Sequence, residues 1–139
     1  MIACAVAAIA SAAANPDSAE DQYVHVWRGE GLNAWKNANM SRNVRVEDGM
    51  LKLGSTGWDS FITGPAIDLA PKADQEVVFT AKVSVGGRGQ LFWSRPQDPA
   101  PLERFAREFE WIADGRFHTY RVRPYWQGAG KVVRLRLDF

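Results

Sequence analysis

Residues 114–139, DGRFHTYRVRPYWQGAGKVVRLRLDF, decide the fold class of this chain. Apolar and polar residues alternate through residues 117–122 and again through residues 131–139. A period of two predicts strands with one buried side and one solvent-facing side. In the second strand the apolar residues share one side, and Arg134 and Arg136 share the other. The end of the chain is therefore predicted to form a β-hairpin, or two strands of one sandwich, with a basic outer face.

Strand-like segments of the same kind precede this stretch, separated by turns rich in Gly, Pro and Asn. The clearest is residues 76–85, and Asp48-Gly49 between two apolar runs predicts a tight hairpin. Residues 104–112 fit a helix or a strand, and we favour a strand because a turn and another strand follow. The other expected elements are strands at 23–27, 44–46, 50–53, 60–63 and 90–94, an edge segment at 65–69, a loop with one helical turn at 29–43 and a proline-containing loop at 95–102.

Many short strands without a long helix predict an all-β protein, an antiparallel β-sandwich of the jelly-roll type. The chain has 139 residues, which suits one domain, and we place that domain at residues 23–139. Its 46% hydrophobic and 24% charged residues are typical of a folded protein. The formal net charge of +1 argues against a dedicated nucleic-acid binder, which is usually strongly basic.

Residues 1–14 have the pattern of an export signal. Residues 2–14 are small, apolar and uncharged, and Ala12-Ala13-Ala14 before Asn15 matches a cleavage site. The stretch is too short to span a bilayer. No Lys or Arg precedes it, so the true start lies upstream or the leader is atypical; the alternative is a buried or membrane-anchoring helix. We expect a short leader helix at 1–14, a polar linker at 15–22, a secreted or periplasmic location and no membrane span.

The segments GQLFW (89–93), DGRFHTY (114–120) and WQGAGKVVRLRLD (126–138) resemble a galactose-binding-like jelly-roll module of secreted bacterial polysaccharide-degrading proteins. The resemblance covers most of residues 44–139. It implies a non-catalytic carbohydrate-binding or accessory role, with a polysaccharide or oligosaccharide as ligand and a catalytic glycoside hydrolase domain as a candidate partner. Such modules usually continue through another strand, so we expect a domain truncated at its C-terminus.

Aromatic residues beside polar ones are the candidate binding residues. Sugar rings stack a flat C–H face on an aromatic ring, while their hydroxyl groups need charged or amide partners. The arginines of the last two strands add candidate contacts for an anionic polysaccharide. The alternative is that the rings close the ends of the sandwich and that the arginines pair with glutamates such as Glu108 and Glu110. The candidate ligand-binding residues are Trp58, Asp59, Trp111, Arg121, Tyr125, Trp126, Gln127 and Arg134.

Two further functions stay open on the sequence alone. Glu108 and Glu110 share one side of a strand, about 6.5–7 Å apart along the chain, a separation that paired glycosidase carboxylates use. The short chain leaves little material for the walls of a substrate cleft, so we expect no enzyme. A purely structural packing domain is the other alternative.

No catalytic or metal-binding motif is evident. The only cysteine is Cys4, and His25 and His118 are the only histidines, which supports neither a metal cluster nor a Ser-His-Asp triad. We expect no cofactor. A structural Ca²⁺ ion would have to use Asp48, Asp59 or Asp138, although no calcium-loop spacing is present.

Overall fold

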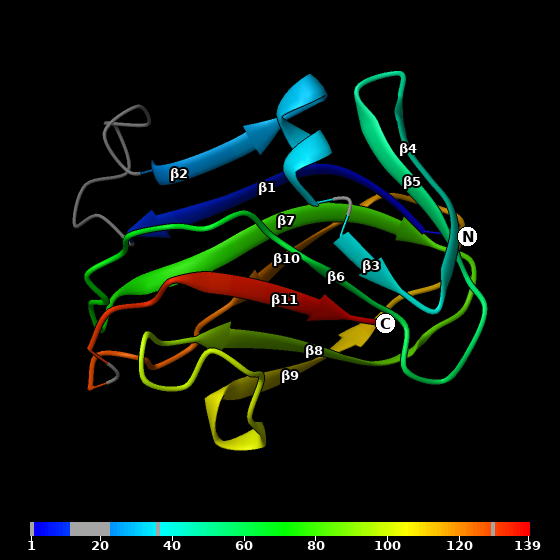
Figure 1. Cartoon of the computed structure of the whole chain (residues 1–139). Coiled ribbons are helices and arrows are strands. Elements are labelled where there is room, and N and C mark those ends of the chain that lie inside the picture. Colours follow the sequence, from blue (N-terminus) through cyan, green and yellow to red (C-terminus); the bar gives the residue numbers. More distant parts are fainter. Residues whose placement is uncertain (1, 12–22, 36, 129) are drawn as a thin grey trace.

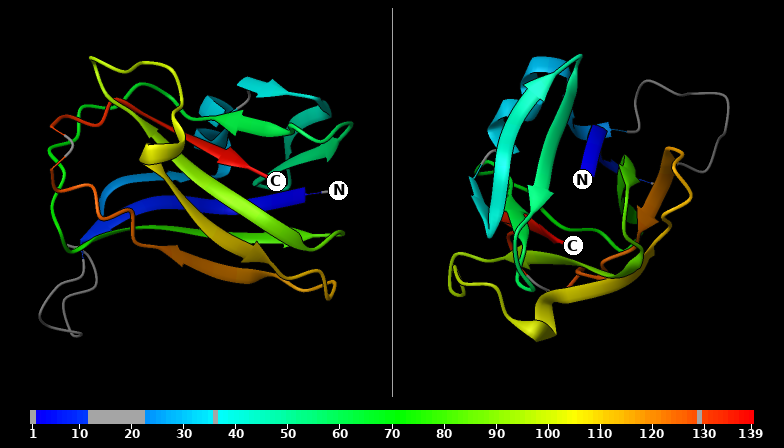
Figure 2. Two further views of the ribbon diagram at one scale, coloured as in Figure 1. Left: turned by 90° about the horizontal axis from the view of Figure 1, so that it is seen from below. Right: turned by 90° about the vertical axis from the view of Figure 1, so that its right-hand side faces the viewer.

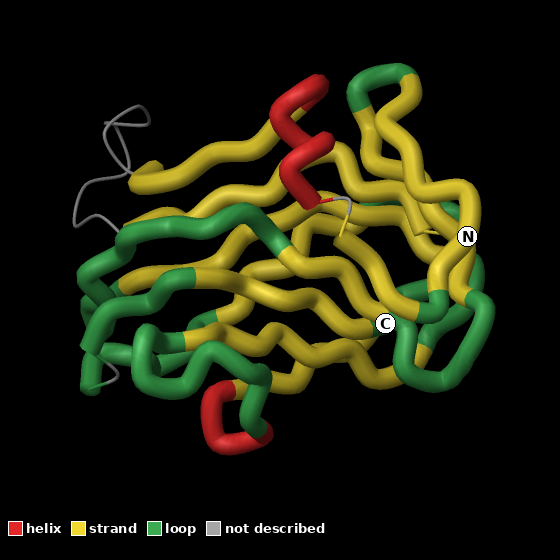
Figure 3. The backbone as a smooth tube through the Cα atoms, viewed as in Figure 1, coloured by secondary structure: helices red, strands yellow, loops and turns green. Residues whose placement is uncertain are grey.

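The computed structural model describes residues 2–11, 23–35, 37–128 and 130–139. Within these ranges the chain forms two antiparallel β-sheets, and the helical turns are two short 3-10 helices (Figure 3). The two sheets pack against each other in a β-sandwich-like arrangement (Figures 1 and 2). The prediction of an all-β protein is confirmed.

The larger sheet, which we call the β7 sheet, has the order β10-β7-β1-β5-β4, with β2 paired to β1. Its strands are β1 (Ile2–Ser11), β2 (Tyr23–Arg28), β4 (Ser41–Glu47), β5 (Met50–Ser55), β7 (Gln75–Val83) and β10 (His118–Val122). The smaller sheet, the β8 sheet, has the order β3-β6-β11-β8-β9. Its strands are β3 (Asn37–Asn39), β6 (Phe61–Thr63), β8 (Gly87–Ser94), β9 (Ala106–Trp111) and β11 (Arg134–Asp138). The helices are η1 (Gly29–Trp35) and η2 (Glu103–Phe105).

The alternation of side chains along the strands builds a core between the sheets. Phe79 of β7 stacks on Tyr120 of β10, with ring centroids 5.2 Å apart. Leu91 of β8 and Leu135 of β11 face them from the other sheet, and both leucines are buried. Each such side chain contributes about 1.5–3 kcal/mol through the apolar surface it removes from water. The core is therefore one cluster that both sheets share.

The hairpin between β4 and β5 has the turn that the sequence predicted. Asp48 and Gly49 have φ values of 54° and 71°, and Glu47 pairs with Met50 across the turn. Positive φ at both central residues of a two-residue turn matches the right-handed twist of the flanking strands. Asp and Gly are the residues that adopt this backbone at little cost.

The last two strands do not form a hairpin. β10 pairs with β7, whereas β11 lies between β6 and β8 in the other sheet. Residues 123–128 and 130–133 lie between these strands and cross between the layers, and a tight hairpin loop has only about 2–5 residues. Trp126 belongs to this crossing segment, and its buried ring packs edge-on against Trp93 with the centroids 5.9 Å apart. Of the two predicted arrangements, the structure has the two strands of one sandwich.

The N-terminal segment is a strand and not the predicted leader helix. β1 pairs with β5 and β7 on its two sides and with β2 along part of its length. The neighbouring strands satisfy its backbone groups, and this tertiary pairing overrides the helix propensity of the alanines. The predicted cleavage site at residues 12–14 and the linker at 15–22 lie outside the described residues. None of the helices in the described ranges has the length and apolarity needed to cross a membrane.

Candidate ligand-binding groove at Trp58

The loop at residues 56–60, between β5 and β6, presents a tryptophan to solvent. The side chain of Trp58 is 92% exposed. Tryptophan is among the more buried residue types on average, because its large apolar surface is costly to hydrate. An exposed indole on an ordered loop therefore calls for a reason beyond folding.

Hydrogen bonds to the carbonyl of Met40 fix the base of this loop. The amide N of Thr56 donates to Met40 O at 2.8 Å, and Ser60 Oγ lies 2.8 Å from the same oxygen. Ser60 is buried, and its hydroxyl also lies 2.6 Å from the hydroxyl of Ser55. A buried polar group held in this way resists movement, because leaving it unpaired costs about 1–3 kcal/mol. The indole is thus carried by a rigid support.

The glycine before Trp58 completes this support. Gly57 O accepts a hydrogen bond of 3.0 Å from Ser55 Oγ. A Cβ atom at Gly57 would lie 2.5 Å from Met40 Sδ, so no larger residue fits there unless Met40 moves. Close packing of the loop on Met40 is therefore the physical reason for glycine at this position.

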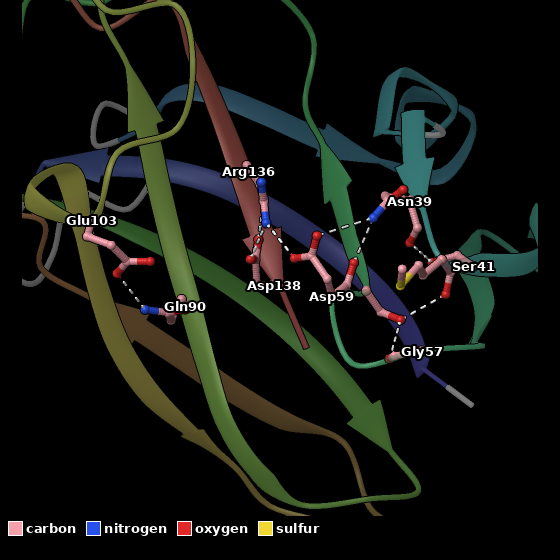
Figure 4. Close-up of polar contacts among 10 residues, drawn as sticks. Asn39, Ser41, Gly57, Asp59, Gln90, Glu103, Arg136 and Asp138 are labelled. Carbon is pink, nitrogen blue, oxygen red and sulfur yellow. Dashed lines mark hydrogen bonds and ion pairs between the residues drawn. The ribbon is translucent and has the colours of Figure 1, made fainter.

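A charged network lies beside the loop on the outer face of the β8 sheet (Figure 4). Arg136 donates to Asp138 from Nε and Nη2, each at 2.6 Å, and Nη2 also donates to Asp59 Oδ1 at 3.1 Å. Asn39 Nδ2 donates to the backbone oxygen of Asp59 at 2.9 Å. The paired contact to Asp138 is the strong, geometrically specific form of an arginine–carboxylate interaction. The network therefore joins the Trp58 loop to β11 and β3.

Two aromatic rings hold the guanidinium of Arg136. The guanidinium carbon lies 3.5 Å from the ring centroid of Phe61 and 5.1 Å from that of Phe92. Only 18% of the Arg136 side chain is exposed. Attraction between a cation and the faces of aromatic rings adds to the ion pairs and fixes the position of the charge.

Burial raises the pKa of the Asp138 carboxyl above its ordinary value. The negative charges of Asp59 and Glu103 raise this pKa further, while the hydrogen bond from Arg136 lowers it. Burial and the two neighbouring negative charges together outweigh the interaction of Asp138 with Arg136. Asp138 therefore takes up a proton at a higher pH than an exposed aspartate does.

These side chains line a groove of about 460 Å³, which we call the Trp58 groove. Its far wall comes from Pro101 in the loop after β8 and from Glu103 at the start of η2, which accepts a hydrogen bond of 3.3 Å from Gln90 (Figure 4). The strand register brings Asn39, Phe61, Asp138, Gln90 and Glu108 into one row across the five strands. The residues that line the groove are Trp58, Asp59, Ser60, Arg88, Gln90, Phe92, Pro101, Glu103, Arg136, Asp138 and Phe139.

Of the predicted binding residues, Trp58 and Asp59 lie together in this groove. The prediction for Trp126 is corrected by the structure, because this residue is 1% exposed and belongs to the core. Trp111 is 4% exposed and also belongs to the core; it lines no part of the Trp58 groove but contributes to the wall of a second groove described below. The indole of Trp126 donates a buried hydrogen bond of 2.9 Å to Gln75 Oε1. A buried ring has no free face for a ligand.

Tyr125 and Gln127 lie on the surface but line no part of the Trp58 groove. Tyr125 is 58% exposed and packs against the guanidinium of Arg107, 5.4 Å from the ring centroid. These two residues follow β10 and belong to the crossing segment, away from the row of side chains described above.

The predicted common face of arginines is wrong. Arg121 lies on the outer face of the β7 sheet and pairs with Glu76 at 3.1 Å. Arg134 lies on the outer face of the β8 sheet, on the other side of the molecule. The two arginine pairs belong to different layers because the chain crosses between β10 and β11. Neither Arg121 nor Arg134 lines the Trp58 groove.

The predicted strand around Glu108 and Glu110 is confirmed as β9, and both carboxylates face outward. Arg88 donates to Glu108 at 3.0 Å. The described residues hold no group of three or more His, Cys, Asp or Glu side chains arranged for a metal ion. Asp48 pairs instead with Lys52 at 3.0 Å, so the three aspartates proposed for calcium do not share one site.

Sequence reasoning missed Gln90, Glu103 and Asn39 as members of the site, and it identified Arg136 only as one of the strand arginines that could contact an anionic polysaccharide. The alternation in β11 already placed Arg136 on an outer face, and Gln90 of GQLFW alternates in the same way. The missing information was the strand order, because β3, β6, β11 and β8 are not consecutive neighbours. A comparison with protein-family models, curated proteins and solved structures gave no match.

Proposed function

We propose that this chain is a non-catalytic module that binds a glycan in the Trp58 groove. The observation that carries the proposal is the 92% exposed indole on a hydrogen-bonded loop, at the edge of a groove lined by carboxylate, amide and guanidinium groups. The jelly-roll form of the sandwich and export of the protein belong to the same proposal, and the resemblance to modules of secreted proteins supports both. Because residues 2–11 form β1, the proposed export leaves this strand in the folded domain.

The chemistry of a sugar matches both parts of this groove. One face of a pyranose ring is made of C–H groups, which pack well on the face of Trp58. The ring hydroxyls both donate and accept hydrogen bonds. Asp59 and Asp138 offer acceptors, and Gln90 offers an amide beside them. A ligand with one apolar face and a polar rim is therefore the best fit.

The preformed geometry favours binding over a flexible, nonspecific contact. The Trp58 loop is held by Met40, and Arg136 is fixed between its aspartates and two aromatic rings. Groups that are already ordered lose little conformational entropy when a ligand arrives. The groove can therefore hold a short segment of a glycan chain without refolding.

A glycan array followed by affinity electrophoresis tests the proposal. The wild-type protein is expected to be retarded by at least one polysaccharide, and Trp58→Ala is expected to lose that retardation. Tyr125→Ala is the matched control, because this exposed aromatic ring lies outside the groove. Folded wild-type protein that binds no glycan at all would contradict the proposal.

The non-catalytic part of the proposal needs its own measurement. Glu108 and Glu110 face outward on β9, and Glu108 is engaged by Arg88, which lines the groove. A small glycosidase that used these two carboxylates would release reducing ends from the bound glycan, and Glu108→Gln would abolish the release. We expect no release of reducing ends from any glycan that binds.

A further inference from the structure

A second groove, of about 570 Å³, lies on the other side of Trp58, and we call it the basic groove. Trp58, Arg88 and Phe139 line both grooves, so the indole stands at the boundary between them. The basic groove lies at the end of the β7 sheet where β5 and β7 present Leu53 and Val83. A chain that crosses the indole therefore reaches both grooves.

The two grooves carry opposite charges. Arg42, Arg45, Lys52 and Arg88 line the basic groove, and no described residue that lines it is an aspartate or glutamate. The Trp58 groove has three carboxylates in its lining, those of Asp59, Glu103 and Asp138, against two arginines, Arg88 and Arg136, and Arg136 is paired with Asp59 and Asp138. An anionic group on a ligand is therefore attracted to the basic groove more strongly than to the other.

Three of these cations already have carboxylate partners, but the pairs lie on the surface. Arg45 and Lys52 contact Glu47 at 3.2 and 2.9 Å, Lys52 also contacts Asp48 at 3.0 Å, and Arg88 contacts Glu108 at 3.0 Å. All three carboxylates are exposed and line neither groove. An exposed ion pair contributes at most about 1 kcal/mol. An incoming anion can therefore compete for these cations at little cost.

Arg42 makes no ion pair with any residue that the structure describes. It pairs with Gly54 across β4 and β5, and its side chain lies over that glycine. A Cβ atom at Gly54 would lie 3.4 Å from Cγ and Nε of Arg42. The glycine thus leaves room for the arginine to lie along the groove wall, with its guanidinium available to a ligand.

We propose that the basic groove binds the anionic substituent of an acidic polysaccharide, while a sugar ring of the same chain stacks on Trp58. This inference rests on the proposed function and adds the class of glycan. Arg42 is the main partner of the carboxylate or sulfate group, through the paired contacts that a guanidinium makes to such groups. The charge contrast between the grooves also sets the direction of the chain across Trp58.

Titration calorimetry with matched polymers tests this proposal. Polygalacturonate and its methyl ester share a sugar ring and differ in the carboxylate, whereas carrageenan and chemically desulfated carrageenan share a backbone and differ in sulfate. The wild-type protein is expected to bind one acidic polymer at least about tenfold more tightly than its neutral counterpart, since one charge-assisted contact contributes about 1.5–3 kcal/mol. The pair that shows the preference identifies carboxylate or sulfate as the anion.

Variants separate this proposal from the proposed function. Arg42→Gln is expected to weaken acidic binding about tenfold and to leave neutral binding unchanged. Arg121→Gln, which makes the same charge change on the outer face of the β7 sheet, is expected to change neither. Trp58→Ala is expected to weaken the binding of acidic and of neutral polymers. If Trp58→Ala weakens binding while Arg42→Gln does not, the proposed glycan-binding function stands and the proposed role of the basic groove is overturned.

Three other outcomes also overturn the inference about the basic groove. These are equal affinity of the wild-type protein for acidic and neutral polymers, no binding of any acidic polymer, and equally tight binding of polyglutamate. Polyglutamate carries carboxylates without sugar rings, so its binding would show attraction to charge alone.

Discussion

Arg136 binds Asp138 through two hydrogen bonds of 2.6 Å, and yet the pKa of Asp138 is raised. The pair lies on the outer face of the β8 sheet, where Phe61 and Phe92 cover the guanidinium. Burial of the carboxylate and the nearby charge of Asp59 together outweigh the ion pair. The charged form of Asp138 is therefore less favourable in the folded protein than in water.

The raised pKa of Asp138 determines the direction in which its contribution to stability changes with pH. The folded state holds this proton up to a higher pH than the unfolded state, so folding is favoured by protonation. The contribution of Asp138 is present below the ordinary aspartate pKa and is lost as pH rises through the raised value. The difference in free energy of unfolding, wild type minus Asp138→Asn, is expected to fall across that pH range. Urea unfolding at a series of pH values measures it, and a rise would contradict the prediction.

Glu76 should show the opposite pH dependence. Hydrogen bonds from Arg123 and Arg121 lower its pKa, with burial acting against them. Its stabilising contribution is present above the ordinary glutamate pKa and is lost as pH falls through the lowered value. We expect Glu76→Gln to cost up to about 1 kcal/mol at neutral pH, since the arginines are exposed, and to leave glycan affinity unchanged. Denaturant melts and calorimetry check the two parts. Weaker glycan binding by Glu76→Gln would contradict the prediction, because it would show that the outer face of the β7 sheet takes part in binding.

Trp126 and Trp58 should respond differently to replacement by alanine. Trp126→Ala removes a buried ring and leaves Gln75 Oε1 without its indole donor, so we expect a loss of about 3–5 kcal/mol. Trp58→Ala removes an exposed ring, and we expect a change within about 0.5 kcal/mol. Denaturant unfolding of both variants measures these values. A large loss of stability in Trp58→Ala would mean that the indole serves the fold.

Replacement of Ser60 tests whether a rigid Trp58 loop is needed for glycan affinity. Ser60→Ala leaves Met40 O without this hydroxyl, and we expect a cost of about 1–2 kcal/mol in stability. A looser loop must be ordered on binding, so glycan affinity should fall. Ser60 lines the groove, but it is only 1% exposed and its hydroxyl is bonded to Met40 O, so the fall would come from the loop and not from a lost ligand contact. Thr119→Ala is the control, because it removes an exposed hydroxyl contact on the outer face of the β7 sheet. Equal glycan affinity in Ser60→Ala and wild type would show that the loop needs no such support.

The sequence predicted most strands because alternation and turn residues are local signals. β7, β8, β9 and the Asp48-Gly49 hairpin lie where the pattern indicated. The sequence did not predict β3, since Asn37–Asn39 has no apolar alternation, nor the strand at residues 2–11, whose alanines suggest a helix. Both segments are extended because neighbouring strands pair with their backbones.

The candidate site was harder to predict than the fold. Trp58 and Asp59 were identified because an aromatic residue beside a carboxylate in a glycine-containing loop is a local pattern. The rest of the groove depends on strand order, which brings residue 39 and residue 90 to opposite sides of β6 and β11. Trp126 has equally polar neighbours, and only the crossing between the sheets explains why it is buried.

The indole N–H signal of Trp58 tests the central claim most directly. The protein has six tryptophans, and in a ¹H–¹⁵N spectrum each gives a separate indole signal that single Trp→Phe variants assign. On titration with the glycan that binds most tightly, the Trp58 signal is expected to shift and saturate. The signal of buried Trp126 is expected to stay in place. Saturable glycan binding that leaves the Trp58 signal unmoved would contradict the assignment of the Trp58 groove as the binding site.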